Sequence, residues 1–292
     1  MLSIFRGENM KILVTGYTGQ LGFDVVRELK ARNIECIGTT RNEFSLTDTE
    51  KMKSFVREYK PDVIIHCAAY TAVDKAEDEV DICRAVNTDA TKHLAEVCKE
   101  IDAKMIYIST DYVFPGDGEA FYEPDDNKAP QNIYGQTKLD GELEVQAILD
   151  KYFIVRISWV FGINGKNFIK TMLNLAKIHD KLTVVNDQIG SPTYTVDLAK
   201  LLCDMALSDK YGVYHATNEG ICSWYDFACK IFKRAGIKID VEPVPSTAFP
   251  TKATRPHNSR MSKKCLDKAG FNRLPTWQDA LSRYLQELNR YV

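Results

Sequence analysis

The fold is decided by residues 11–22 near the start of the chain, which read KILVTGYTGQLG. Residues 11–15 are mostly apolar and predict a buried strand, and Gly16, Gly19 and Gly22 follow at the spacing of a turn into a helix. Such a turn brings backbone N–H groups and the positive end of a helix up to a pyrophosphate. The stretch therefore predicts a dinucleotide-binding unit. Its expected cofactor residues are Gly16, Thr18, Gly19, Gln20, Leu21 and Gly22.

Beyond this unit, short apolar strands alternate with amphipathic helices. Nearly unbroken apolar strands suit a parallel sheet that is covered on both faces. The expected fold is therefore α/β, a Rossmann-type doubly wound parallel sheet with a smaller C-terminal substrate-binding domain. Thr47 and Glu50 have the spacing of a capping box that opens the second helix. Further strands are expected at 34–38, 63–67, 105–109, 153–157 and 213–216, and helices at 21–32, 49–59, 80–101, 134–149, 168–179, 196–207, 223–235 and 276–288.

The alternation becomes irregular after about residue 158, where prolines interrupt loops and a few short helices. We therefore expect a dinucleotide-binding domain of residues 10–157 plus about 193–218. A sugar-nucleotide substrate domain is expected at about 158–192 and 219–292. Residues 1–9 match no pattern, so Met10 is a candidate natural start.

Composition excludes several classes of protein. A hydrophobic fraction of 45% in 292 residues excludes a disordered chain, and a net charge of -2 offers no patch for nucleic acid or an anionic membrane. The eight cysteines include no CxxC pair, and no run of about 18 apolar residues is present. The sequence therefore predicts a cytoplasmic protein with a small-molecule partner.

The end of the second strand bears on the choice of cofactor. Residues 36–41, CIGTTR, lack the acid that would bind the ribose hydroxyls of NAD. Arg41, beside Thr39, instead offers a cation for a 2′-phosphate. We expect NADPH, with NADH as the alternative if Arg41 is an ordinary surface charge.

A phenol and an ammonium lie one helical turn apart at Tyr134 and Lys138. A nearby cation favours the phenolate, so Lys138 and the positively charged nicotinamide of the oxidised cofactor are expected to lower the pKa of Tyr134 and let it donate a proton to a carbonyl oxygen. Thr110 ends the fourth strand at its carboxyl edge, where ligands of open α/β sheets bind. It is expected to hydrogen-bond the same oxygen.

With these residues the chain resembles the extended short-chain dehydrogenase/reductase family, and within it the branch of dTDP-4-dehydrorhamnose reductases. The resemblance runs from about Met10 to the C-terminus. Besides the glycine turn and the Tyr/Lys pair, it rests on 68–77 (AAYTAVDKAE), 109–114 (STDYVF), 156–162 (RISWVFG), 187–193 (DQIGSPT) and 255–259 (RPHNS).

The resemblance implies reduction of the C4 ketone of dTDP-4-dehydro-β-L-rhamnose to dTDP-L-rhamnose. It implies that Thr110, Tyr134 and Lys138 are catalytic and that Arg255 lies near the nucleotide phosphates. The other residues that it implies are Ala68 and Ala69 at the cofactor, and Thr71, Val73, Asp111, Tyr112, Trp159, Gln188 and Thr193 at the substrate.

Some relatives form dimers through a magnesium site of acidic residues, but Asp197 supplies only one carboxylate here, so we assign no metal. The oligomeric state, monomer or homodimer, stays open. One alternative is a non-catalytic regulatory subunit similar to the β subunit of methionine adenosyltransferase, although the catalytic residues are intact. The other is a different nucleotide-sugar 4-ketoreductase or an epimerase, which would retain NAD.

Overall fold

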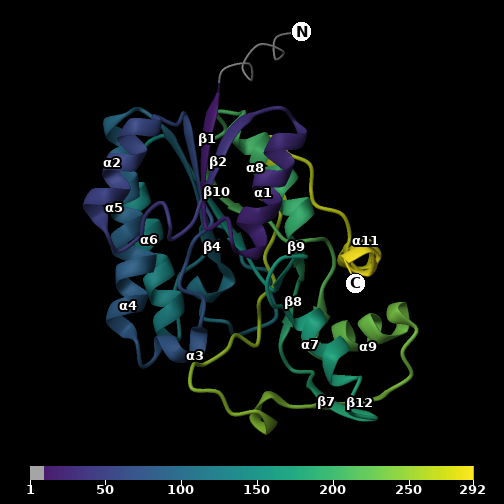
Figure 1. The fold of residues 1–292 in the computed structure, drawn as a ribbon. Helices are drawn as coiled ribbons and strands as arrows, with labels where there is room; N and C mark the ends of the chain where they lie inside the picture. The colour runs from purple at the N-terminus through teal and green to yellow at the C-terminus, as the bar shows by residue number, and fades with distance from the viewer. Residues whose placement is uncertain (1–9, 292) are drawn as a thin grey trace.

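A six-stranded parallel sheet organises the computed structural model, which describes residues 10–291 (Figure 1). The spatial order is β10-β5-β4-β3-β1-β2, and every neighbouring pair is parallel. This confirms the expected Rossmann-type sheet; the expectation for residues 1–9 lies outside the described residues. The strands are β1 (Lys11–Thr15), β2 (Glu35–Thr39), β3 (Val63–His66), β4 (Lys104–Thr110), β5 (Tyr152–Ile157) and β10 (Gly212–His215).

Helices cover both faces of the sheet, as its apolar strands require. Ile12 and Val14 of β1 face a core shared with two helices, α1 (Gln20–Ala31) and α8 (Thr195–Ala206). Leu13, between them, points into a second core on the other face. That face is covered by α2 (Thr49–Tyr59), α5 (Ala90–Glu100) and α6 (Ile133–Ile148), which Figure 1 shows as one group.

The chain reverses direction across the sheet between β1 and β3. It runs outward from β1 to β2 and then returns to form β3 on the other side of β1. The loops after β1 and β3 therefore leave in opposite directions, and ligands of open α/β sheets bind in the crevice that this creates.

The later part of the chain has a third core, formed with three helices. These are α7 (Phe168–Leu175), α9 (Trp224–Ala235) and α11 (Trp277–Tyr291). A parallel strand pair that the sequence analysis did not predict packs beside α9, and Pro243 is tolerated there because its strand lies at an edge. The short strands of this region are β6 (Val160–Phe161), β7 (Lys181–Val185), β8 (Ile189–Gly190), β9 (Thr193–Tyr194), β11 (Cys222–Ser223) and β12 (Asp240–Val244), and the short helix is α10 (Lys264–Ala269).

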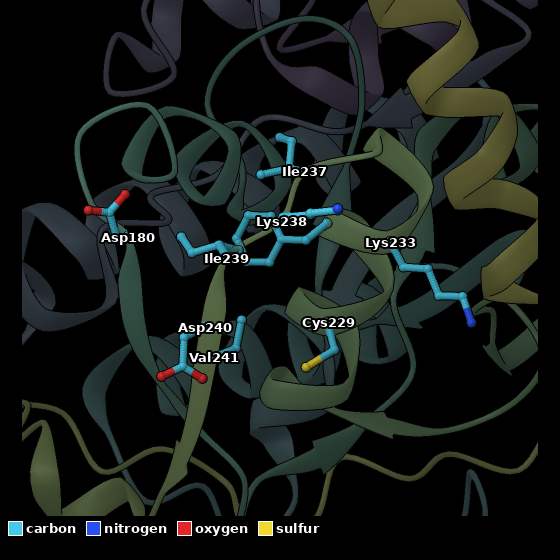
Figure 2. Close-up of a pocket in the computed structure, with 9 residues that line it drawn as sticks. Asp180, Cys229, Lys233, Ile237, Lys238, Ile239, Asp240 and Val241 are labelled. Carbon is cyan, nitrogen blue, oxygen red and sulfur yellow. The ribbon is translucent and has the colours of Figure 1, made fainter.

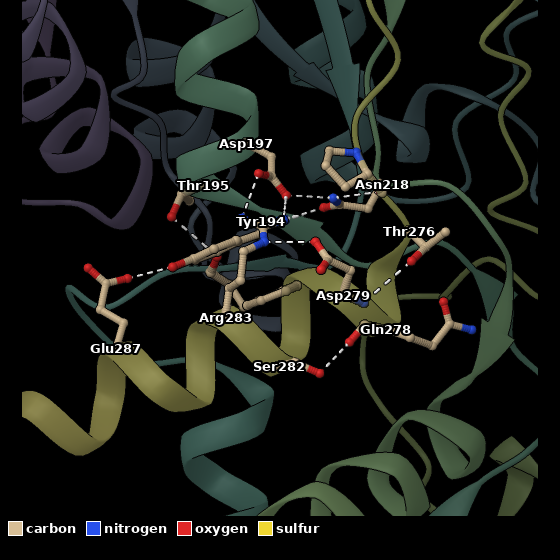
Figure 3. Close-up of polar contacts among 12 residues, drawn as sticks. Tyr194, Thr195, Asp197, Asn218, Thr276, Gln278, Asp279, Ser282, Arg283 and Glu287 are labelled. Atoms are coloured by element: carbon tan, nitrogen blue, oxygen red, sulfur yellow. Dashed lines mark hydrogen bonds and ion pairs between the residues drawn. The ribbon is translucent and has the colours of Figure 1, made fainter.

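Polar contacts attach α11 to α8 and β9 (Figure 3). Arg283 donates to both carboxylate oxygens of Asp197, at 2.8 and 2.6 Å, and Asn218 donates to the same carboxylate at 2.8 Å. The Tyr194 hydroxyl donates to Glu287 at 2.5 Å. Asp197 is thus neutralised by an arginine, and among residues 10–291 no group of three or more His, Cys, Asp or Glu side chains is placed to hold a metal.

The single helix expected at 80–101 is wrong in one respect, because a π-helical turn divides it. The segment consists of α4 (Val80–Arg84), the π turn Ala85–Asp89 and α5. Asn87 lies in this turn: its side chain accepts from the Tyr70 N–H at 2.8 Å, and its carbonyl accepts from the Thr91 hydroxyl at 2.8 Å. The contact with Tyr70, which lies outside the segment, cannot be read from the helical pattern. A shorter helix, α3 (Val73–Ala76), precedes this segment.

The predicted capping box of Thr47 and Glu50 is also wrong. Asp48 is the N-cap of α2, and its carboxylate accepts from the Lys51 N–H at 3.1 Å. The Thr47 hydroxyl bonds instead with Ser45 at 2.9 Å. A cap accepts from an N–H two or three residues further on, and the helix starts at Thr49, so Asp48 rather than Thr47 is the residue directly before it.

No helix among the described residues is long and apolar enough to span a membrane. The remaining expected helices and strands are present, with ends that differ by one or a few residues; the largest difference is in α7, which ends at Leu175 rather than 179.

Asp48→Ala is expected to lower the free energy of unfolding by about 0.5–2 kcal/mol, because the Lys51 N–H loses its acceptor. Thr47→Ala is the matched control and should change it by less than about 0.5 kcal/mol. Urea denaturation of both variants measures the difference. A larger loss of unfolding free energy in Thr47→Ala than in Asp48→Ala would contradict the assignment of Asp48 as the cap.

Candidate active site

A cleft of about 720 Å³ opens along the carboxyl ends of β1 to β5. Its walls come from the turn after β1, the ends of β2 to β5, and α6. All predicted cofactor and catalytic residues line it, together with five of the eight predicted substrate residues. The lining includes Gly16, Thr18, Gly19, Gln20, Leu21, Gly22, Thr39, Arg41, Ala68, Ala69, Thr71, Val73, Thr110, Asp111, Tyr112, Tyr134, Lys138 and Trp159.

The glycine turn after β1 has no space for side chains. Gly16 adopts φ +73°, and a Cβ there would lie 2.8 Å from the backbone N and Cα of Ala68. A Cβ at Gly22 would lie 2.4 Å from the carbonyl oxygen of Gly16. No side chain caps the start of α1. The exposed N–H groups and the bare turn fit a dinucleotide pyrophosphate.

A loop from the later part of the chain holds this turn in place. The Asn164 amide donates to the carbonyl oxygens of Thr18 and Gly19, at 2.9 and 3.3 Å. The Gln20 side-chain oxygen accepts from the Gly162 N–H at 3.0 Å. Gln20 lines the cleft, but its side-chain oxygen is already occupied by the Gly162 N–H.

The end of β2 leaves one cation free for a ligand. Arg41 is exposed and has no hydrogen bond or ion pair within residues 10–291. The nearby acid, Glu43, is already engaged, since it accepts from the N–H and hydroxyl of Thr40 at 2.6 and 2.8 Å. These hydrogen bonds lower the pKa of Glu43.

Three side chains expected to be catalytic meet in the cleft. Thr110 ends β4, and Tyr134 and Lys138 lie in the first two turns of α6. Asn132 caps this helix by accepting from the Gly135 N–H at 2.7 Å. The ring of Tyr134 meets that of Tyr112 edge to face at 5.5 Å.

The pKa values in this group are set mainly by burial. Burial lowers the pKa of Lys138 to about 7, while the Glu142 carboxylate acts in the opposite direction. Burial raises the pKa of Tyr134, and its hydrogen bond with Thr110 opposes this. In the protein without cofactor, burial therefore dominates the pKa of the phenol, and the expected lowering of that pKa by Lys138 together with the oxidised nicotinamide stays a prediction.

A buried ion pair lies beneath these three side chains. Arg156 of β5 donates to both oxygens of Glu142, at 2.9 and 2.7 Å. Ser109, the neighbour of Thr110, donates to the same carboxylate at 2.5 Å. Arg156 and Glu142 are each about 2% exposed. The pair ties the end of β4 to the helix that carries Tyr134 and Lys138.

The Thr110 hydroxyl is oriented by the next residue. It donates to Asp111 at 2.9 Å, and the Ser259 hydroxyl donates to the other oxygen of this carboxylate at 2.5 Å. Burial raises the pKa of Asp111 to about 6, although both hydrogen bonds oppose the shift. Thr110 is thereby connected to the segment 255–259.

Three predicted substrate residues do not line the cleft. Thr193 is fully buried, and its hydroxyl donates to the Ser158 carbonyl at 2.6 Å. Gln188 is buried outside the lining. Arg255 pairs with Asp74 at 2.6 Å and donates to the hydroxyl of the lining residue Tyr112 at 3.3 Å. Their predicted contacts with substrate stay predictions.

Figure 2 shows a second depression, between α9 and β12. Lys233 and Lys238 lie there with Asp180, Asp240 and two isoleucines, Ile237 and Ile239. None of the predicted site residues lines it.

Sequence reasoning missed four residues that support the site: Asn87, Glu142, Arg156 and Trp224. Arg156 lies in the apolar strand of a motif that the resemblance used, so its charge was an available signal, and Glu142 lies four residues after Lys138, at the spacing of a helical pair. Nothing in the local pattern singles out Asn87 or Trp224.

This sheet, with its glycine turn and Tyr-x-x-x-Lys helix, defines a dinucleotide-dependent oxidoreductase of the extended short-chain class. Residues 10–290 match the model of the RmlD substrate binding domain, and the chain belongs to this family.

Individual relatives agree with this assignment. The dTDP-4-dehydrorhamnose reductase of Escherichia coli K12 is 39% identical over 297 residues, covering 96% of this chain and 98% of that protein. A reductase of the same name from Clostridium acetobutylicum has a solved structure with a TM-score of 0.94 at 42% identity, over 96% of this chain and 100% of that one. The Bacillus anthracis reductase, solved in complex with NADP, gives a TM-score of 0.93 at 40% identity, over 96% and 99% of the two chains.

Lys138→Met is expected to stabilise the cofactor-free protein most at low pH. The folded-state pKa of Lys138 is about 7 and its ordinary value is 10.5, so between these values the unfolded chain binds a proton that the folded chain does not. From pH 7 towards pH 10, the free energy of unfolding of the wild type should therefore rise relative to that of the variant, by up to about 1.4 kcal/mol per pH unit. Urea denaturation at pH 6, 8 and 10 measures this. A difference that does not change with pH would contradict the burial of this lysine.

Proposed function

We propose that the protein reduces the C4 ketone of dTDP-4-dehydro-β-L-rhamnose to the alcohol of dTDP-L-rhamnose, with NADPH as reductant. One observation carries the proposal: Thr110, Tyr134 and Lys138 line the same cleft as the glycine turn. The relatives named above are reductases of this substrate, and one of them was solved with NADP.

The bare turn at Gly16, Gly19 and Gly22 would hold the pyrophosphate, and Arg41 would pair with the 2′-phosphate. NADPH supplies the hydride for the ketone carbon when it is bound. Arg41 fits the role because no acid of the described chain neutralises it, and the only acid beside it already binds Thr40.

Tyr134 would act as the proton donor to the ketone oxygen. Burial raises the pKa of this phenol, so it keeps its proton at neutral pH until charge develops on the substrate oxygen. Thr110 would hydrogen-bond the same oxygen by turning its hydroxyl proton from Asp111, to which it donates without substrate, towards the ketone. A protonated Lys138 would stabilise the phenolate that remains.

Substrate recognition is assigned to both regions of the chain. Thr71, Val73 and Trp159 line the part of the cleft that we assign to the sugar. We assign the nucleotide phosphates to Arg255, which would exchange Asp74 for a phosphate on binding, as a charge-assisted pair of similar geometry. In this assignment residues 10–157 and about 193–218 bind cofactor, and about 158–192 and 219–292 bind the sugar nucleotide.

We place the reaction in the cytoplasm, where the eight free cysteines would stay reduced. A sugar nucleotide is the partner that this cleft suits, and a net charge of -2 makes nucleic acid an unfavourable one.

The regulatory-subunit alternative is disfavoured because a subunit without activity has no need of the three aligned catalytic side chains. An epimerase is disfavoured because Arg41 favours NADPH over a retained NAD. Following NADPH oxidation with a panel of nucleotide-linked 4-keto-6-deoxy sugars separates these possibilities. The proposal would be contradicted if the protein turned over no sugar of the panel.

Tyr134→Phe is expected to lower kcat by about 10²-fold or more, because general acid catalysis contributes about 10²–10⁴. The affinity for NADPH should change little, and its measurement controls for loss of structure. Stopped-flow or steady-state absorbance at the nicotinamide band gives kcat. Near-normal turnover would remove Tyr134 from the mechanism.

Arg41→Ala is expected to reduce kcat/KM for NADPH by at least about tenfold, the equivalent of one charge-assisted hydrogen bond, and to leave NADH unaffected. Both cofactors are compared in wild type and variant. Equal use of NADH and NADPH by both proteins would show that Arg41 does not bind the 2′-phosphate.

A further inference from the structure

Trp159 has a backbone conformation that bulky residues rarely adopt. Its φ is +50°, in the left-handed region, and it lines the cleft. The other described non-glycine residues with positive φ are Asn33, Lys60 and Asp102, which lie just after helices. Conformations of this kind persist only where the surroundings determine them, and they gather at functional sites.

Hydrogen bonds fix the backbone on both sides of this residue. The Ser158 hydroxyl donates to the Ser191 carbonyl at 2.8 Å, and the Thr193 hydroxyl donates to the Ser158 carbonyl at 2.6 Å. The Thr193 N–H donates to the Trp159 carbonyl at 3.1 Å. The segment that includes Ser191 and Thr193 therefore directs the indole without reaching the cleft itself.

The indole is held as firmly as its backbone. Trp224 stacks on it with ring centroids 3.7 Å apart and an interplanar angle of 14°. Phe168 supports Trp224 from behind at 4.7 Å. A Cβ at Gly190 would lie 2.9 and 3.0 Å from the indole atoms Cε2 and Cζ2, so only glycine leaves the ring in this position.

Trp224 itself does not line the cleft. It is the first residue of α9, and its capping serine, Ser223, forms a complete capping box with Asp226. The start of α9 is thus a rigid base, and Trp224 contacts the cleft only through Trp159.

We propose that Trp224 is a positioning residue that sets the affinity of the enzyme for the sugar part of its substrate, by holding Trp159 as an aromatic wall. This inference rests on the proposed function. The apolar parts of a 6-deoxy sugar are its C–H face and its methyl group, and an aromatic ring is the usual surface for such groups. The wall should therefore distinguish a nucleotide that carries the sugar from one that does not.

Trp224→Ala tests the proposal with three ligands: the product dTDP-L-rhamnose, dTDP and NADPH. Removing the stack should raise the Kd of dTDP-L-rhamnose about tenfold, on the scale of one aromatic contact. The Kd values of dTDP and NADPH should stay within about twofold, because their assigned contacts lie on other elements. In turnover, KM for the keto sugar should rise more than kcat falls. Isothermal titration calorimetry and initial rates give these values.

Circular dichroism reports the stack directly. The chain has three tryptophans, and Trp159 and Trp224 are the only stacked pair of indoles that the described residues contain. Two indoles at this distance couple their transitions, so the wild type should show an exciton couplet that dTDP-L-rhamnose perturbs. Trp277→Phe is the matched control: it alters an aromatic residue of the same core that has no ring contact with Trp159, so the couplet and sugar affinity should persist.

Two further variants keep the proposal testable if Trp224→Ala does not fold. Trp224→Phe retains a flat ring and should restore part of the sugar affinity without the couplet. Gly190→Ala places a methyl group of β8 against the Trp159 indole, so it should displace the ring and weaken the binding of dTDP-L-rhamnose but not of dTDP.

The proposal is overturned if a folded Trp224→Ala loses the couplet yet binds dTDP-L-rhamnose with the wild-type Kd. It is also overturned if the variant loses affinity for dTDP and for dTDP-L-rhamnose by the same factor. Failure of the proposed function has a different result, since the wild type would then neither bind dTDP-L-rhamnose nor oxidise NADPH with the keto sugar.

Discussion

The structure depends on how closely two backbones approach beside β1. Gly16 lies against Ala68 where the chain has reversed between β1 and β3, and no Cβ fits between them. The Thr15 hydroxyl joins the two strands there, bonding to His66 at 2.7 Å and accepting from the Ala68 N–H at 3.2 Å. This contact places the start of α1 at the crevice, and the cofactor and substrate parts of the cleft are arranged around it.

Buried charge is the main energetic cost of the site. Lys138, Glu142 and Arg156 are each nearly inaccessible, and Glu142 is the acid that compensates both cations. Removing one member of the Glu142–Arg156 pair leaves an unpaired buried charge, which costs about 3–5 kcal/mol, whereas the intact pair adds little net stability. The network is therefore better explained by geometry than by stability, because it joins the end of β4 to α6 beneath the reacting groups.

The later region also contacts the glycine turn and Thr110, which belong to the proposed cofactor and catalytic sites. Asn164 holds the carbonyl oxygens of the glycine turn, and Ser259 orients Thr110 through Asp111. The 188–193 segment fixes the backbone of Trp159. Each of these contacts joins residues more than 30 positions apart in the chain, so the cleft is complete only when both regions have folded.

The sequence by itself determined the sheet, most helix positions and the residues of the cleft, because glycine spacing, apolar runs and the Tyr-x-x-x-Lys pattern are local constraints. Only the tertiary structure decided the roles of Asn87, Glu142, Arg156 and Trp224, whose partners lie outside their own helix or strand. It also shows that burial raises the pKa of Tyr134 in the protein without cofactor, since sequence shows a neighbouring lysine but not the burial of either side chain. Spacing along a chain predicts which groups can meet, whereas burial and long-range contacts decide their charge, orientation and strain.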